Sequence, residues 1–327
     1  MGNEKASGSP LESAAGAAGP QAVEAFERVG DETRLAILLA LWEDYEPFDD
    51  DNALSFSELL DRVNYDTSGN FSYHLQKLEG HFVASTPEGY RLKQAGHRLV
   101  RAVVAGTGLT EETLSPTEID FDCRMCGEPL AVTYENEQLY TVCTECEGRF
   151  ASSNEAPPGT IMGFPFDPAG LSRSSPEEIF AASVVRAMGK FTMQMGGLCP
   201  ECSGSVDSSI HICQHHESDG ICSHCGRGDQ LQARWVCTTC KNAGHAPPGP
   251  NLALHPRVAA FYAERGLDIG YNTNDFASVI RMLKAMSNHQ QELVSTDPVR
   301  VRVTIRYAGD QLRAIIDESM KIVEVED

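Results

Sequence analysis

Hydrophobic residues in the first hundred positions recur mostly at the spacing of an amphipathic helix. Ile37, Leu38 and Leu41 lie on one helical face behind Asp31, a residue suited to a helix N-cap. Phe71 and Leu75 lie four residues apart, and Leu78 continues the same face. The pattern predicts helices over residues 22–29, 32–42, 57–63, 70–79 and 94–105, with Ser57 as the N-cap of the third.

The two halves of the chain differ in the number of strands that their sequence pattern predicts. In the first half, "HFVAS" and "YRLK" flank the turn sequence "TPEG" and predict a single hairpin. In the second half, residues 299–307 alternate strictly, with valines and Ile305 on one face and arginines on the other. The segments 311–319 and 321–327 continue as strands, whereas residues 176–196, 256–265 and 275–293 have helical spacing. The arginine row suits either an anionic ligand or a solvated face balanced by acidic residues, and we favour the solvated face.

Clusters of proline and glycine at 106–118, 156–160 and 246–250 divide the chain. The expected class is α+β, with a winged helix-turn-helix followed by zinc ribbons embedded in a helical and antiparallel-β C-terminal domain. The expected parts are a disordered tail (1–20), a winged helix-turn-helix (21–109), a zinc ribbon (118–155), a helical connector (156–198), a double zinc-binding module (199–245) and a helical/β-hairpin C-terminal domain (246–327).

The charge of the chain is strongly acidic, with 47 acidic against 26 basic residues and a formal net charge of −21. Most of the basic residues are arginine, and this composition resembles that of proteins from salt-loving archaea. The alternative interpretation is an acidic protein from a mesophile. Non-specific DNA binding is mostly electrostatic, so an acidic protein needs a local surface without carboxylates to bind DNA. With no targeting or membrane segment in the sequence, we expect a cytoplasmic protein without a membrane partner.

Cysteine pairs are the strongest chemical signal. Cys123, Cys126, Cys143 and Cys146 form two Cys-x2-Cys pairs with zinc-ribbon spacing. Gly127 follows the second cysteine, where the knuckle needs a permissive backbone. In a chain expected in the cytoplasm, such pairs favour a metal over disulfides.

The remaining cysteines are odd in number, so two four-ligand sites need one histidine. Cys213-x2-His216 repeats the knuckle spacing, with His211, His215 or His224 as alternatives to His216. We expect sequential sites, which would use Cys199, Cys202, Cys213 and His216 in one case and Cys222, Cys225, Cys237 and Cys240 in the other. A cross-brace that joins the first pair to the third is the alternative. Three structural Zn²⁺ ions are therefore expected.

Residues 67–78 contain no aspartate or glutamate, and neither do residues 89–110. If the helix at 70–79 enters the major groove, its polar side chains contact bases and phosphates. The candidate DNA-binding residues of this helix and the adjacent hairpin are Ser68, Asn70, Ser72, Tyr73, His74, Gln76, Lys77, Arg91 and Lys93.

The segments "VGDETRLAILLAL", "SYHLQKL" and "GYRLKQAG" resemble the ArsR-type winged helix of haloarchaeal transcription regulators over about residues 21–105. The resemblance implies a homodimer that is built from the first and last helices and binds double-stranded DNA. The arsenic-sensing cysteines of that family are absent, since no cysteine precedes Cys123. The second half resembles the zinc-ribbon domain found behind such winged helices, which implies architecture and no mechanism.

These observations predict a DNA-binding transcription regulator whose C-terminal half receives an unknown effector. An adaptor that binds protein or RNA through its ribbons is one alternative, and a metal or redox sensor at the second cysteine cluster is another. A zinc-dependent hydrolase or deaminase would need an open coordination position, and the sequence has neither His-Glu-x-x-His nor a His-x-Glu partnered with Pro-Cys-x2-Cys. We therefore expect no enzyme activity.

Overall fold

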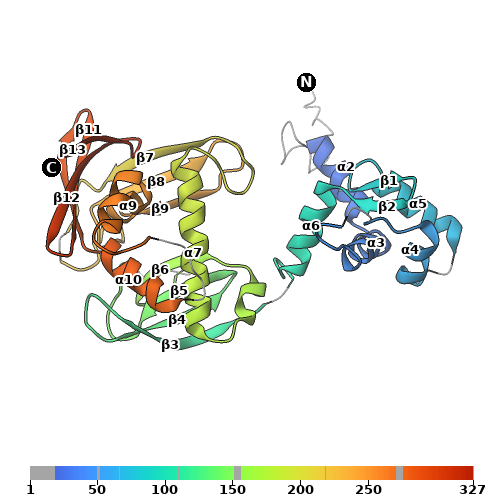
Figure 1. Cartoon of the computed structure of the whole chain (residues 1–327), viewed down its shortest axis with the longest axis horizontal. Helices are drawn as coiled ribbons and strands as arrows, with labels where there is room; N and C mark the ends of the chain where they lie inside the picture. Colours follow the sequence, from blue (N-terminus) through green and yellow to red (C-terminus); the bar gives the residue numbers. More distant parts are fainter. Residues whose placement is uncertain are drawn as a thin grey trace, which may run out of the picture. The chain divides into compact units, whose positions relative to one another are not determined.

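The computed structural model describes residues 19–49, 52–65, 67–109, 111–150, 156–217, 219–269 and 275–326. It divides into two compact units, Met1–Leu109 and Thr110–Asp327, which are described separately (Figure 1). The architecture is mixed α+β, and the strands pair in antiparallel fashion throughout the described residues. Nearly all of the tail predicted at 1–20 lies outside the described residues.

The first unit consists of helices around one small hairpin. Its elements are α2 (Gly19–Val29), α3 (Glu32–Glu43), α4 (Phe56–Val63), α5 (Ser68–Leu78), β1 (Val83–Thr86), β2 (Gly89–Leu92) and α6 (Gln94–Val104). The apolar residues predicted to face inward do so: Ile37 and Leu38 of α3 pack with Phe71, Leu75 and Leu78 of α5 in one core. The sequence periodicity therefore gives the correct inner faces of both helices.

Of the two helix caps predicted in this unit, one is confirmed and the other is wrong. Asp31 caps α3, since its side chain accepts a hydrogen bond from the Arg34 amide at 3.1 Å. The prediction of Ser57 as the next cap is wrong. Ser55 caps α4 instead, in a capping box in which the Glu58 side chain accepts from the Ser55 amide. This reciprocal pair satisfies two amides that would otherwise lack partners.

The second unit contains three antiparallel sheets. The first has the order β3 (Leu114–Asp122), β4 (Pro129–Glu135), β5 (Gln138–Cys143) and β6 (Thr160–Pro165). The second is β7 (Val206–Ile212), β8 (Leu231–Cys237) and β9 (Ala243–Ala246), and the third is β10 (His289–Thr296), β11 (Val299–Tyr307), β12 (Asp310–Asp317) and β13 (Ile322–Glu326).

One buried cluster joins the three sheets through the helices of this unit. These are α7 (Pro176–Met195), α8 (Pro248–Asn251), α9 (Pro256–Ala263) and α10 (Phe276–Met286), with short 3-10 turns η2 (Pro168–Ser172) and η3 (Leu252–Leu254). Figure 1 shows α7 running alongside the first and second sheets, and it packs on β3, β5, β6 and β7. The three sheets of this unit therefore share one hydrophobic core around α7 and do not form separate domains.

Two segments differ from the sequence prediction. The helix predicted over 275–293 ends at Met286, and His289–Thr296 forms strand β10. Pairing with β11 explains the change, because alternate β10 residues are exposed and one of them, Glu292, binds Arg302. In the predicted helical connector, Thr160–Pro165 is instead the fourth strand of the first sheet.

The arginines of β11 lie on the face opposite Val301, Val303 and Ile305. Arg302 pairs with Glu292 at 2.9 Å and with Glu326 at 3.4 Å, and Arg306 donates to Gln290 at 3.0 Å. These contacts are those of a solvated, charge-balanced face. In the described part of the chain, no helix is both long and apolar enough to cross a membrane.

Candidate functional site

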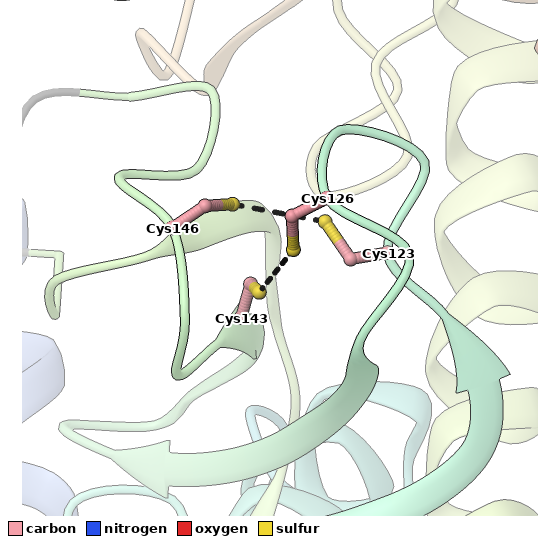
Figure 2. Close-up of side chains that lie close together, drawn as sticks. All are labelled: Cys123, Cys126, Cys143 and Cys146. Atoms are coloured by element: carbon pink, nitrogen blue, oxygen red, sulfur yellow. Dashed lines mark hydrogen bonds between the residues drawn. The ribbon is translucent and has the colours of Figure 1, made fainter.

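The first candidate metal centre lies at one end of the sheet β3–β6. Cys123 and Cys126 come from the loop between β3 and β4, and Cys143 and Cys146 come from the end of β5 and the loop after it. Figure 2 shows the four thiols converging from these two loops. The Sγ atoms of Cys123 and Cys146 are 3.7 Å apart, and those of Cys126 and Cys143 are 3.4 Å apart.

Backbone hydrogen bonds fix the shape of the Cys123 loop. The Gly127 amide donates to the Cys123 carbonyl at 2.8 Å, and the Cys123 amide donates to Glu128 at 2.7 Å. Gly127 has a φ of +89°, as the sequence led us to expect, and this left-handed conformation favours glycine. The same two-bond turn recurs after Cys199, Cys222 and Cys237, with positive φ at Ser203, Gly226 and Lys241.

The second cysteine-rich segment is one long hairpin with a candidate centre at each end. At the base, Cys199 and Cys202 meet Cys237 and Cys240, with Sγ–Sγ distances of 3.6 Å for Cys199–Cys240 and 3.5 Å for Cys202–Cys237. At the tip, Cys213, His216, Cys222 and Cys225 come together, and His216 Nδ1 lies 3.6 Å from Cys225 Sγ. We call these four-residue groups the base centre and the tip centre.

The predicted pairing of these ligands is wrong. All eight residues are brought together in fours, but the first of the four ligand pairs joins the fourth, and the second, Cys213 and His216, joins the third. This is neither the sequential nor the cross-brace arrangement. The cause is the hairpin itself. Strand β7 separates Cys202 from Cys213 by seven extended residues, about 20 Å at the usual rise of a strand. Strand β8 returns over the same distance, so ligands meet across the hairpin rather than along it.

The three groups fit a tetrahedral metal. Zinc–sulfur bonds of about 2.3 Å place tetrahedral sulfur atoms about 3.8 Å apart, close to the distances between these thiols. A disulfide requires sulfur atoms about 2.05 Å apart, and all eleven cysteines are free. Each group offers four ligand atoms within 4.8 Å of one another and could hold one metal ion.

Electrostatics within the groups favour thiolate at particular positions. Backbone hydrogen bonds from Cys240 outweigh burial and, with Thr239, lower the pKa of Cys237 to about 6. Burial acts to raise the pKa of Cys222, but amides of the surrounding loop, including that of Glu217, lower it to about 6. Burial raises the pKa of Cys146 to about 12 in the presence of its neighbouring thiols. Cys237 in the base centre and Cys222 in the tip centre therefore lose their protons more easily than an ordinary thiol. Each of these two centres thus has one thiolate ready to bind a metal cation.

The alternative histidine ligands lie outside the tip group. The exposed rings of His215 and His224 lie with their centroids 5.5 Å apart and their planes tilted by 46°, and His211 is on β7. Only His216 completes the tip group among the described residues.

In the first unit, most polar residues predicted to bind DNA are exposed on α5. Ser68, Asn70, Tyr73, Gln76 and Lys77 are exposed, whereas Ser72 is half-buried and accepts from Gln76 at 3.5 Å. The Lys77 ammonium lies 5.4 Å from the centre of the Tyr73 ring. The outer face of α5 thus presents hydroxyl, amide and ammonium groups without a carboxylate of its own.

Three predicted DNA-binding residues have additional surroundings. The half-buried His74 ring lies with Nδ1 3.1 Å from Asp31 Oδ1, so it links α5 to the N-terminus of α3. Lys93 donates to the Gly80 carbonyl at 2.6 Å and so holds the turn after α5. Arg91 is exposed on β2.

Sequence reasoning missed a groove beside α5. Tyr73, Gln76 and Lys77 line this groove together with Glu24 and Glu27 of α2. Helical spacing within α2 gives no indication of which helix it packs on, so these carboxylates could not be placed next to α5 in advance.

Two protein-family models match the chain, one within each of its two units. A family model described as a domain of unknown function (DUF7351) matches residues 120–322, more than half of the chain. The chain belongs to this family. A second model, a domain of unknown function (DUF7347), matches residues 22–103, within the first unit. No curated protein and no solved structure matches.

Proposed function

We propose that the chain is a sequence-specific DNA-binding transcription regulator whose first unit is a winged helix-turn-helix. The order of α4, α5 and the hairpin β1–β2 suits this motif, with α5 as the helix that enters the major groove. The observation that carries the proposal is the exposed face of α5, which has no carboxylate in a chain of net charge −21. DNA repels carboxylates, so their absence from this face supports contact there.

The side chains of α5 suit base contacts better than phosphate contacts. Asn70 and Gln76 have the amide groups that pair with adenine edges, and Ser68 is suited to either kind of contact. Glu24 and Glu27 line the same groove as Gln76, but so do Arg28 and Arg34, and Glu24 is paired with Arg28. The groove therefore has mixed charge, and the proposal assigns a base edge to Gln76 because of its amide group.

The proposal gives the metal centres a structural role with Zn²⁺ as the ion. Each ligand set is complete with four sulfur or imidazole atoms, which is the composition of closed structural zinc sites. Bound zinc would hold the loops of small sheets together, because metal binding adds to folding free energy. A closed set leaves no coordination position for a substrate, and we propose no catalytic activity.

A homodimer is part of the proposal. Phe26 of α2 is 73% exposed, and Val104 of α6 and Leu109 after it are 54% and 62% exposed. Exposed apolar side chains on the first and last helices suit contact with a second copy of this chain. A dimer would read two half-sites about one helical turn apart.

The test compares Gln76→Ala with Gln94→Ala, an exposed glutamine at the start of α6. A high-affinity duplex is first selected from random DNA with the unaltered chain. Loss of a base contact costs about 1–3 kcal/mol, so Gln76→Ala is expected to weaken binding to the selected duplex by about 5- to 150-fold. Affinity for random DNA and the Gln94→Ala variant should change little. Equal losses on both DNAs would reject base reading by Gln76, and failure to select any duplex would reject the function.

A further inference from the structure

The outer face of the sheet β7–β9 gathers basic groups. Ser209 on β7, Arg234 on β8 and His245 on β9 lie directly opposite one another in the strand register, so their side chains share one face. The inner face of the same sheet carries Ala233 and Trp235, which are buried in the core of the unit. Ser209 and His245 are exposed, and Arg234 is half-buried, so the group remains open to solvent.

The turn of the tip centre adds a second arginine. Arg227 follows this turn, and its Nη2 lies 3.2 Å from His245 Nε2 while its Nη1 donates to the Cys225 carbonyl at 3.1 Å. Its Nε atom is buried without a hydrogen-bond partner. A bridge between Arg227 and Phe150 places an aromatic ring at the edge of the group, 6.0 Å from the His245 ring. We call Ser209, Arg227, Arg234 and His245 the basic face.

Carboxylates do not neutralise these arginines. Among the described residues, neither Arg227 nor Arg234 has an acidic group within ion-pair distance, and the nearby Asp229 is paired with Arg149. Burial is the main cause that lowers the pKa of His245 to about 4, and the positive charges of Arg227 and Arg234 act in the same direction. In a chain with 47 acidic residues, two neighbouring arginines without an ion-pair partner among the described residues form a local surface that favours an anion.

We propose that the basic face binds a small phosphate-bearing anion. Two guanidinium groups suit the oxygens of a phosphate, and the Ser209 hydroxyl and the His245 ring provide further donors beside them. Phe150 offers a surface for an aromatic part of such a ligand. The site is independent of the proposed DNA contact, since all of its residues belong to the second unit.

The ligand is a small anion rather than a nucleic-acid backbone. A duplex needs many phosphate contacts, and the basic face offers two arginines with the exposed Asp207 further along the same face of β7. A backbone crossing this face would meet that carboxylate, whereas a single phosphate group would not need to.

The test uses the full-length, zinc-loaded chain and measures binding of inorganic phosphate and of pyrophosphate by calorimetry in a chloride buffer. Arg234→Gln removes one guanidinium from the basic face, and Arg313→Gln, an exposed arginine on β12 of another sheet, is the matched control. We expect Arg234→Gln to weaken binding at least about tenfold and Arg313→Gln to leave it unchanged. Unchanged zinc content in both variants excludes loss of the tip or base centre as the cause.

A second measurement follows the His245 ring by NMR over a pH series. A bound anion would offset the positive charges beside His245 and raise its pKa, and the rise should disappear in Arg234→Gln. Equal affinity of the unaltered chain and Arg234→Gln would overturn the proposal. So would a weaker affinity of Arg234→Gln for random duplex DNA without any loss of phosphate binding, because that result would assign the face to a nucleic-acid backbone.

Discussion

Two glycines beside the first candidate metal centre have similar backbones and different surroundings. Gly127 and Gly159 have φ values of +89° and +76°, a region that favours glycine over any side chain. A Cβ atom on Gly127 would meet nothing within 4 Å, whereas one on Gly159 would lie 1.9 Å from the Cys143 carbonyl oxygen. Gly159 therefore packs directly against a ligand residue of another segment, whereas Gly127 shapes the turn of Cys123 and Cys126 without a close contact at its Cβ position.

Alanine substitutions separate these two effects. Gly127→Ala should cost about 1 kcal/mol of stability from backbone strain and leave metal content unchanged. Gly159→Ala must displace Cys143 and should cost several times more. We expect it to lower the metal content of the first centre, measured by zinc analysis and thermal unfolding on both variants. Equal stability losses in the two variants would show that the close approach of Gly159 to Cys143 does not position the ligand.

At the scale of elements, the sequence could not specify which ligand pairs meet. In the structure the arrangement is nested: the two inner pairs meet at the tip of the hairpin and the two outer pairs meet at its base. The ligand residues are a local property, since Cys-x2-Cys spacing already marks a knuckle. Their pairing depends on which strands align, and spacers of ten, five and eleven residues between the pairs are compatible with several arrangements. Strand β10 illustrates the same limit. The segment His289–Leu293 contains glutamine and glutamate, which favour helices, and only its pairing with β11 makes it a strand. Elements with strong internal periodicity, such as α5 and β11, were predictable because their burial follows from their own sequence.

Double substitutions distinguish the nested arrangement from its alternatives. Cys199→Ser with Cys240→Ser removes two ligands of the base centre, so the chain should lose one of three zinc ions. In the sequential and cross-brace arrangements the same two residues belong to different sites, and two ions would be lost. Cys199→Ser with Cys213→Ser is the matched control, for which the nested arrangement predicts loss of two ions. Metal analysis on purified protein, with zinc retained through gel filtration, gives the counts; loss of two ions by the first variant would reject nesting.

For the whole molecule, the division into two units separates the metals from the proposed DNA contact. All twelve candidate ligands lie in Thr110–Asp327, and none lies in Met1–Leu109. The chain has two tryptophans, one in each unit. Trp235 is 3% exposed in the core that joins the sheets of the second unit, and Trp42 packs against the core of the first. Each tryptophan is therefore a reporter of one unit.

Removal of metal should unfold the second unit selectively. Because metal binding contributes folding free energy to sites that are absent from the unfolded chain, a strong zinc chelator is expected to expose Trp235 and shift its emission to longer wavelength. The emission of Trp42 should stay unchanged, because the core around Ile37 and Leu75 contains no ligand. The variants Trp42→Phe and Trp235→Phe isolate the two signals, and added zinc should restore the Trp235 emission. If Trp42 responded at the same chelator concentration, the first unit would depend on the metals, and the two units could not be treated as independently stable parts.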